Sequence, residues 1–251
     1  MDREQLKRSG QVLAPSIFTM GNMACGFYAI MSAHIGNFTE AATAICLGVV
    51  FDMLDGRVAR LVHGESSFGV EFDSLADFLT FCVTPAYMMC ALLFKDYGPL
   101  GYVASFMFTL CGALRLARFN AIAQAGEGSK KTFQGLPTPA AAGFLASFVL
   151  LYEIVEQGKS TKMLSIFLDL VPIIADIGPV LMIALAFLMV SNIPYGAFKQ
   201  QKSGSIRPMI FAGTVMVLLY YFPENSLFFI TLSYILSGLF GAVLKIFPKR
   251  A

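Results

Sequence analysis

Long apolar stretches, each interrupted by a few polar residues, follow one another along almost the whole chain. A helix needs about 20 apolar residues to cross a bilayer, and short polar segments separate stretches of about that length. The pattern predicts an all-α fold, a polytopic membrane helical bundle of about eight transmembrane helices. The expected spans are residues 15–36, 39–61, 73–94, 99–121, 138–156, 172–197, 207–222 and 225–246.

The sixth span is the least regular of these. The apolar run over residues 163–197 is too long for one straight span, and Pro172 and the pair Gly178-Pro179 interrupt it. Proline removes a backbone donor and breaks or kinks a helix. Residues 163–176 therefore either extend the span or form a separate helix at the membrane interface.

Composition agrees with a membrane protein. Hydrophobic residues make up 57% of the chain and charged residues 14%, whereas soluble domains have about 45–50% and about 25%. The net charge of +2 is small and the basic residues are scattered, so we expect no nucleic-acid partner. The five cysteines lie in apolar stretches without a CxxC pair, which argues against a disulfide framework or a zinc site. Residues 1–251 are expected to form a single integral-membrane domain.

Basic residues indicate how the spans are oriented. If the N-terminus lies in the cytoplasm, every Lys and Arg except Lys95, Lys159 and Lys162 falls in a cytoplasmic segment. Cytoplasmic loops carry an excess of such residues. We therefore expect an integral protein of the inner (cytoplasmic) membrane, with both termini on the cytoplasmic side and an even number of spans. Six spans with two re-entrant or interfacial segments are the alternative to eight.

Four aspartates stand at the ends of two apolar spans. Asp52 and Asp55 are three residues apart, and Asp73 and Asp77 are four apart, so each pair lies on one face of its helix. A short loop joins the two spans, which must run antiparallel. The two acidic faces can therefore meet near the cytoplasmic boundary.

Carboxylates gathered in this way need a compensating charge. One Asp at mid-membrane costs about 2.5–3.5 kcal/mol on insertion scales, and four close carboxylates cannot all stay ionised. A divalent cation, or a pair of them, removes both problems. Ligation by oxygen favours Mg²⁺ or Mn²⁺ over zinc. Two such ions can bind both the attacking and the leaving oxygen when a phosphoryl group is transferred.

Small and basic residues surround the aspartates. Gly56, Ala59 and Gly69 let a ligand approach the backbone closely. Arg57 and Arg60 offer positive charge for a diphosphate. The alternative, a capped helical hairpin with solvated charges at the membrane surface, leaves this combination of residue types unexplained.

Together these residues resemble the signature motif of the CDP-alcohol phosphotransferase family. The motif covers residues 52–77, and each of its positions is matched. In this chain it reads Asp52-x2-Asp55-Gly56-x2-Ala59-Arg60-x8-Gly69-x3-Asp73-x3-Asp77.

The resemblance implies an enzyme that transfers a phosphatidyl-type group from a CDP-linked donor to an alcohol and releases CMP. It also implies a six-helix core, a homodimer and a polar cavity that opens to the cytoplasm. Asp77 would be the general base for the acceptor hydroxyl. Gly56, Ala59 and Gly69 would pack on the CDP moiety, and Arg60 would contact the phosphates. The ligands of the two divalent cations, Mg²⁺ or Mn²⁺, would be Asp52, Asp55, Asp73 and Asp77.

Other segments narrow the acceptor alcohol. Residues 14–27, 115–120, 133–143 and 191–199 resemble the branch of the family that uses L-serine. The resemblance implies that CDP-diacylglycerol, a membrane lipid, and L-serine give phosphatidylserine and CMP. A CDP-alcohol phosphotransferase that uses glycerol phosphate or inositol phosphate is an alternative, and so is a cation transporter that uses the Asp cluster as an ion pathway.

Serine is a zwitterion, so its site needs a cation for the carboxylate. Arg115 and Arg118 are three residues apart at the cytoplasmic end of the fourth span, and we expect at least one to bind serine. Ordinary anchoring by positive charge is the alternative. Asn120 is the third residue expected at the serine site, if it enters the cavity; the alternative is that it caps this span. Thr19 and Asn22 bind cytidine or phosphate, or hydrogen-bond to neighbouring helices.

Overall fold

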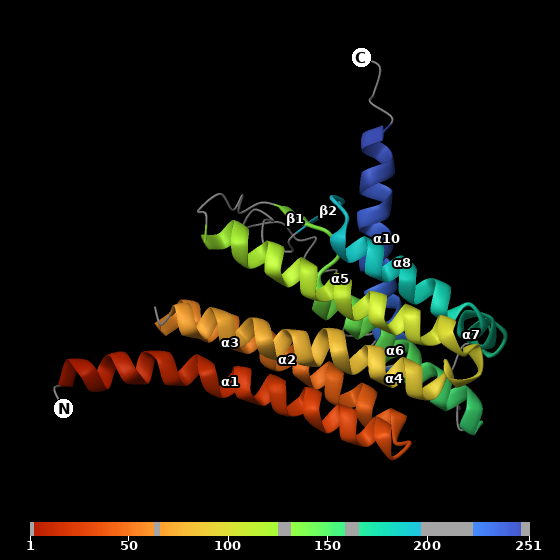
Figure 1. The fold of residues 1–251 in the computed structure, drawn as a ribbon, viewed down its shortest axis with the longest axis horizontal. Helices are drawn as coiled ribbons and strands as arrows, with labels where there is room; N and C mark the ends of the chain where they lie inside the picture. The colour runs from red at the N-terminus through yellow and green to blue at the C-terminus, as the bar shows by residue number, and fades with distance from the viewer. Residues whose placement is uncertain (1–2, 63–65, 125–131, 159–165, 197–222, 247–251) are drawn as a thin grey trace.

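The computed structural model describes residues 3–62, 66–124, 132–158, 166–196 and 223–246, which are helical over most of their length (Figure 1). The predicted all-α membrane fold is confirmed. In chain order the helices are α1 (Arg3–His34), α2 (Phe38–Val62), α3 (Ser67–Asp77), α4 (Thr84–Leu92), α5 (Pro99–Gln124), α6 (Thr138–Gln157), α7 (Ile166–Asp176), α8 (Gly178–Val190) and α10 (Pro223–Ile246).

Shorter elements connect these helices. The π-helical turn η1 (Phe78–Val83) joins α3 to α4 without a break, and the 3₁₀ turn η2 (Lys95–Tyr97) leads into α5. Two strands that the sequence pattern did not predict, β1 (Thr132–Gln134) and β2 (Pro194–Gly196), pair antiparallel. They tie the segment before α6 to the segment after α8.

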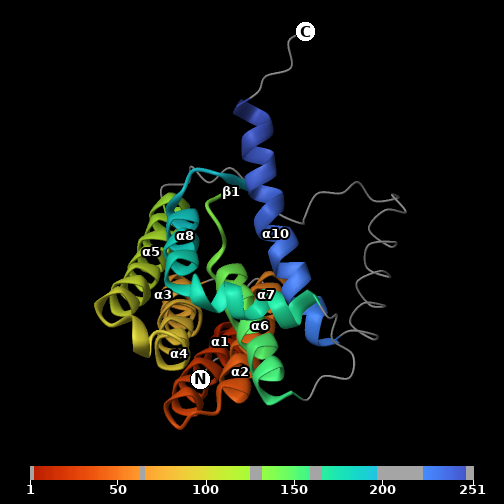
Figure 2. The same ribbon diagram turned by 90° about the vertical axis from the view of Figure 1, so that its right-hand side faces the viewer.

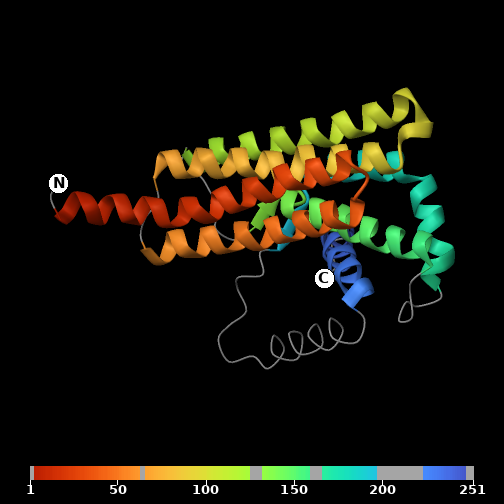
Figure 3. The ribbon, with the colours of Figure 1, turned by 90° about the horizontal axis from the view of Figure 1, so that it is seen from below.

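The helices α1, α2, α3–α4 and α5 run lengthwise beside one another (Figure 1). The N-terminal end of α1 projects beyond its neighbours, as Figure 3 shows from below. Helix α10 crosses the others and packs on α6 and β2 (Figure 2). The cytoplasmic end expected from the charges is the end at which α1 begins, α2 and α5 end, and α3 and α6 begin.

Four of the described helices are long and apolar enough to cross a membrane, namely Phe68–Leu92, Pro99–Ile122, Thr138–Gln157 and Asn225–Ala242. They coincide with the expected third, fourth, fifth and eighth spans. Helices α1 and α2 cover the first two expected spans but are more polar, and α1 begins at Arg3 rather than near residue 15. The expected span 207–222 lies outside the described residues, so the count of eight stays a prediction.

The sixth expected span, 172–197, falls on two helices rather than one. Helices α7 and α8 are bent by 75° against each other, and together they are long and apolar enough for a broken span or a re-entrant loop. The break falls where Pro179 starts α8, because proline favours the first turn of a helix. Helix α8 ends at Val190, and the chain then enters β2. The alternative of a separate helix before residue 177 fits α7, whose last residue accepts a hydrogen bond from the Tyr97 hydroxyl (2.8 Å).

Glycines bring three helices against the π-helical turn. A Cβ on Gly26 of α1 would lie 2.9 Å from the Thr80 Cα, and one on Gly48 of α2 would lie 2.6 Å from the Thr80 Cγ2. On the other side, a Cβ on Gly112 of α5 would lie 3.0 Å from the Cys82 Cβ. Small residues allow such close approach of membrane helices. The turn η1 is therefore the centre on which α1, α2 and α5 pack.

Hydrogen bonds fix the same contact. The Thr80 hydroxyl donates to the Asn22 carbonyl (2.9 Å), and the Thr84 hydroxyl donates to the Gly26 carbonyl (3.2 Å) and to the Leu79 carbonyl (2.8 Å). Both threonines are fully buried. Because a buried hydroxyl without a partner is costly, these bonds set the rotation of η1 against α1.

Replacing Gly26 by Ala should destabilise the protein. The new methyl group would overlap the Thr80 backbone, and overpacking of this kind costs about 1–3 kcal/mol. Thermal unfolding in detergent measures the effect. The control is Gly241→Ala on α10, where a Cβ meets nothing within 4 Å. Equal unfolding temperatures for the two variants would show that this contact is not tightly packed.

Candidate active site

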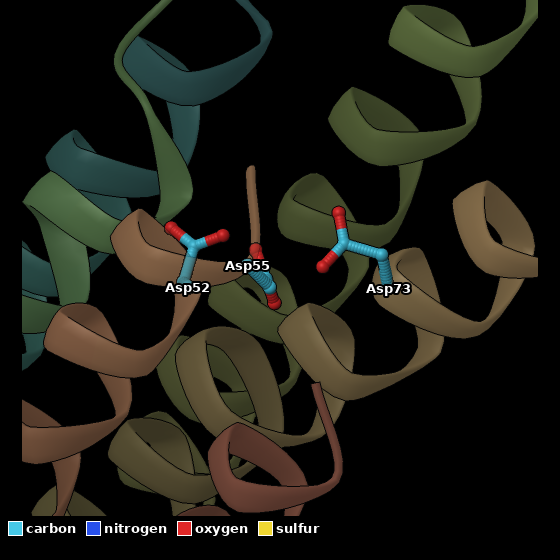
Figure 4. Close-up of side chains that lie close together, drawn as sticks. All are labelled: Asp52, Asp55 and Asp73. Atoms are coloured by element: carbon cyan, nitrogen blue, oxygen red, sulfur yellow. The ribbon is translucent and has the colours of Figure 1, made fainter. Parts of the chain in front are cut away.

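Two antiparallel helices present the four predicted aspartates. Helix α2 carries Asp52 and Asp55, and α3 carries Asp73 and Asp77. Carboxylate oxygens of Asp52, Asp55 and Asp73 lie within 4.8 Å of one another, and these three form the carboxylate cluster (Figure 4). Asp55 is the most buried of them, with 4% of its surface exposed. The structure thus brings together one face of each helix, as the spacing predicted.

Helix α1 holds two of the carboxylates. The Thr19 hydroxyl donates to Asp55 Oδ2 (3.2 Å), and the Asn22 side-chain amide donates to Asp77 Oδ1 (3.0 Å). Both donors are buried. The hydrogen bonds to neighbouring helices expected for Thr19 and Asn22 are therefore present, and binding of cytidine or phosphate by these residues stays a prediction.

Asp77 stands apart from the carboxylate cluster. It lies one helical turn further along α3 than Asp73 and is the last residue before η1. π-Helical turns are rare and are often found at functional sites. The same turn carries Thr80, which holds the backbone of Asn22, so Asp77 and its amide partner are fixed by one contact.

The carboxylate cluster fits a divalent cation. Three carboxylates at this separation repel one another when ionised. Oδ1 of Asp73 is buried and has no hydrogen-bond partner within the described part of the chain. A hard cation bound by oxygen would neutralise the charge and satisfy this atom. Asp52, Asp55 and Asp73 are the residues that could hold it.

The other motif residues flank the cluster. Gly56 and Ala59 are half-buried on α2, and Arg57 is exposed. Arg60 also lies on α2, but its side chain is not among those described. Gly69 stands in the first turn of α3, where its N–H donates to the Ser66 hydroxyl (3.0 Å).

The three residues expected at the serine site differ in their contacts. Half-buried Arg115 donates to the Thr138 hydroxyl at 3.5 Å and lies within electrostatic range of Asp77. Arg118 is exposed and donates to Asn192 Oδ1 (2.9 Å). The two arginines therefore do not face the same group, although they are three residues apart.

Helix α5 is fastened to α3 beside the site. The Asn120 amide donates to the Ser74 hydroxyl (2.8 Å), and the Gln124 amide donates to Glu71 Oε1 (3.1 Å). Ser74 follows Asp73 directly, so Asn120 is a link between helices at the edge of the cluster. Ser74, Gly26, Gly48 and Thr80 were missed in the sequence, because small polar residues and glycines are common in membrane helices.

Comparisons with known proteins agree with this site. The family model described as CDP-alcohol phosphatidyltransferase matches residues 12–173. CDP-diacylglycerol–serine O-phosphatidyltransferase of Helicobacter pylori is 36% identical over 193 residues, which cover 76% of this chain and 74% of that protein. The protein of the same name from Bacillus subtilis is 31% identical over 193 residues, covering 76% and 94%. Archaetidylserine synthase of Methanothermobacter thermautotrophicus is 32% identical over 189 residues, covering 73% and 70%.

Replacing Asp73 by Asn should remove the response of the protein to divalent cations. Mg²⁺ or Mn²⁺ at about 100 times its dissociation constant should stabilise the unmodified protein by about 2.7 kcal/mol, because it binds the folded state. The variant should show little of this gain and, in EDTA, should unfold at the same temperature or higher because one charge is gone. Thermal unfolding in detergent measures both effects.

The control variant is Asp96→Asn in η2, an exposed residue outside the cluster, which should respond to the ions as the unmodified protein does. An equal rise in unfolding temperature for Asp73→Asn would place the cation elsewhere.

Proposed function

Because the chain belongs to the CDP-alcohol phosphatidyltransferase family, we propose that it transfers the phosphatidyl group of CDP-diacylglycerol to the hydroxyl of L-serine, giving phosphatidylserine and CMP. The observation that carries the proposal is the carboxylate cluster of Asp52, Asp55 and Asp73 beside Asp77. The acceptor follows from relatives that are named for serine and that match about three quarters of the chain.

Two divalent cations, Mg²⁺ or Mn²⁺, are the proposed cofactors, with Asp52, Asp55, Asp73 and Asp77 as their ligands. When bound, they would neutralise the diphosphate of the donor and the charge that develops on the departing CMP. Gly56, Ala59 and Gly69 leave space for the CDP moiety, and Arg60 adds positive charge at the phosphates.

Asp77 is the proposed general base. It takes the proton from the serine hydroxyl, whose oxygen forms a bond to the phosphorus that carries diacylglycerol. The bond from this phosphorus to the bridging oxygen breaks, and CMP leaves with the electron pair. The amide of Asn22 orients the carboxylate, since it donates to one oxygen and leaves the other for the substrate.

Arg115 is the proposed partner of the serine carboxylate. Of the two arginines it is the one that turns towards the interior, since it is half-buried and donates to the Thr138 hydroxyl at the start of α6. Arg118 is exposed and engaged at the end of α8, as expected for an anchoring residue. The Asn120 amide donates to Ser74, so its proposed role is to position α3 beside the site.

The reaction also suggests where the protein works. A lipid donor and a water-soluble acceptor meet at the membrane surface, and the carboxylate cluster lies towards the end of the bundle where α2 ends and α3 begins, which the charge pattern of the sequence assigns to the cytoplasm. We therefore place the protein in the cytoplasmic membrane with the site and both termini towards the cytoplasm. Its resemblance to the family suggests a homodimer.

Purified protein should release CMP from CDP-diacylglycerol when L-serine and Mg²⁺ or Mn²⁺ are both present, and EDTA should stop the release. Chromatography of the nucleotide and of the lipid product measures the reaction. Release that depends on glycerol phosphate or inositol phosphate, and not on serine, would keep the reaction class and replace the acceptor. Cation flux in liposomes without nucleotide release would favour a transporter.

Replacing Asp77 by Asn should lower turnover by about 10²–10⁴-fold, because the base is lost. The dissociation constant for CDP-diacylglycerol should change little, since Asp52, Asp55 and Asp73 still hold a cation for the diphosphate and the new side chain still accepts the hydrogen bond from Asn22. Steady-state CMP release and binding of the donor lipid measure the two quantities. Asp96→Asn serves as the control, and turnover near normal in Asp77→Asn would exclude Asp77 as the base.

A further inference from the structure

The C-terminal elements lie largely beyond the part of the chain that the family model matches. That match ends at residue 173, before α8, β2 and α10 begin. These elements nevertheless join the core at the start of α6. The backbone N–H of Gly135 donates to the Ile193 carbonyl (2.9 Å), and that of Leu136 donates to the Leu188 carbonyl (3.0 Å). Thr138, the partner of Arg115, is thus held at a fixed distance from β2.

The residue at this junction must be a glycine. Gly135 has φ +79°, a conformation that other residues rarely adopt. A Cβ at this position would also collide with the Met189 carbonyl and lie 3.1 Å from the Ser191 carbonyl. The junction between β1 and the end of α8 therefore does not tolerate a side chain at position 135.

Tyr195 connects this junction to α10. Its side chain is completely buried, and its ring fills the space beside Gly238, where a Cβ would overlap the ring. The ring centroid lies 5.6 Å from that of Tyr234. Gly238 therefore lets α10 approach β2 closely enough for the two rings to meet.

Two donors in this region lack a partner. The Tyr195 hydroxyl and the Arg115 Nε are both buried, and neither has a hydrogen-bond partner among the residues that the structure describes. The two side chains approach each other through the start of α6, since Arg115 donates to Thr138 and the neighbouring Gly135 donates to the Ile193 carbonyl just before β2, while the Tyr195 ring lies against that of Tyr234. Buried polar groups are nearly always paired, so an unpaired donor calls for a ligand or a water.

We propose that the Tyr195 hydroxyl and the Arg115 Nε bind the carboxylate of the acceptor amino acid, so that β2 and α10 determine which alcohol the enzyme accepts. The inference rests on the proposed function and adds a residue outside the family match. A carboxylate has two oxygens and can accept from both donors at once. Gly112, one turn before Arg115 on α5, packs against Cys82 in η1, the turn that Asp77 immediately precedes, so the carboxylate site lies on the side of α5 that faces the proposed base.

The chemistry of the two donors favours an anion over the ammonium group of serine. An arginine N–H can only donate, and it repels a cation. A tyrosine hydroxyl can donate to a carboxylate at the same time. An acceptor without a carboxylate would leave both donors buried and unpaired, and such a loss discriminates strongly against the wrong substrate.

Tyr195→Phe tests the proposal because it removes the hydroxyl and keeps the ring in place. The KM for L-serine should rise about tenfold or more, as expected for the loss of a hydrogen bond to a charged group. The KM for CDP-diacylglycerol should not change. The unfolding temperature without serine should stay the same or rise, because a buried unpaired group is gone.

The acceptor L-serine amide, which lacks the carboxylate charge, gives a second readout. The preference of the unmodified enzyme for serine over the amide, measured as the ratio of kcat/KM values, should fall by a similar factor in Tyr195→Phe. Tyr102→Phe on α5, whose side chain is 68% exposed, is the matched control and should leave all values unchanged.

The same measurements distinguish a failure of the proposed reaction from a failure of the proposed carboxylate site. Absence of serine-dependent CMP release in the unmodified protein would overturn the proposed function. Serine-dependent release with the same KM and the same acceptor preference in Tyr195→Phe would overturn only the carboxylate site. A KM that rises equally for serine and its amide would show that Tyr195 supports the site without contacting the carboxylate.

Discussion

The contact between η1 and α1 is the constraint on which the site depends. Thr80 fills the space left by Gly26 and Gly48 and donates to the backbone of Asn22. The side chain of Asn22 then donates to Asp77, which immediately precedes the turn. One packing contact therefore sets the distance between α1, α2 and α3 and the direction of one carboxylate. A membrane helix cannot gain such precision from hydrophobic burial, since lipid is as apolar as its side chains, and close backbone contact takes that role.

Charge imposes the second constraint. The carboxylates of Asp52, Asp55 and Asp73 converge from α2 and α3, which both pack on α1, so the fold opposes their mutual repulsion. A cation relieves this repulsion only while it is bound. The hydrogen bond from Thr19 to Asp55 and the packing at Thr80 keep the geometry in its absence. The packed helices thus hold the carboxylates close together against their repulsion, and a bound cation reduces that repulsion.

The positions of the carboxylates could be predicted from the sequence better than the hydrogen bonds and short strands that hold the surrounding structure. Aspartates in apolar spans are chemically exceptional, and helical spacing assigns them to a face, so both pairs could be placed. The bond between Asn22 and Asp77 joins residues 55 positions apart and depends on how α1 is rotated, which no local pattern encodes. Strands of three residues are too short to show a period, so β1 and β2 were missed. In the sixth span, Pro172 and Gly178-Pro179 indicated an interruption, but hydropathy does not give the angle of 75° between the two apolar helices.

Under the proposed function, the region that matches the family model and the elements that follow it have different roles. Phosphate chemistry needs carboxylates in fixed positions, and these come from α2 and α3, inside the family match. Selection of the acceptor needs different side chains around the acceptor site for each alcohol. Arg115 lies on α5 within the match, but Tyr195 and Tyr234, whose rings pack against each other, come from β2 and α10 outside it. A substitution in those outer elements can alter the acceptor site without moving the carboxylates, because the glycine contacts at η1 are made entirely by α1, α2 and α5. A family with one reaction and several acceptors is the result expected of such a separation.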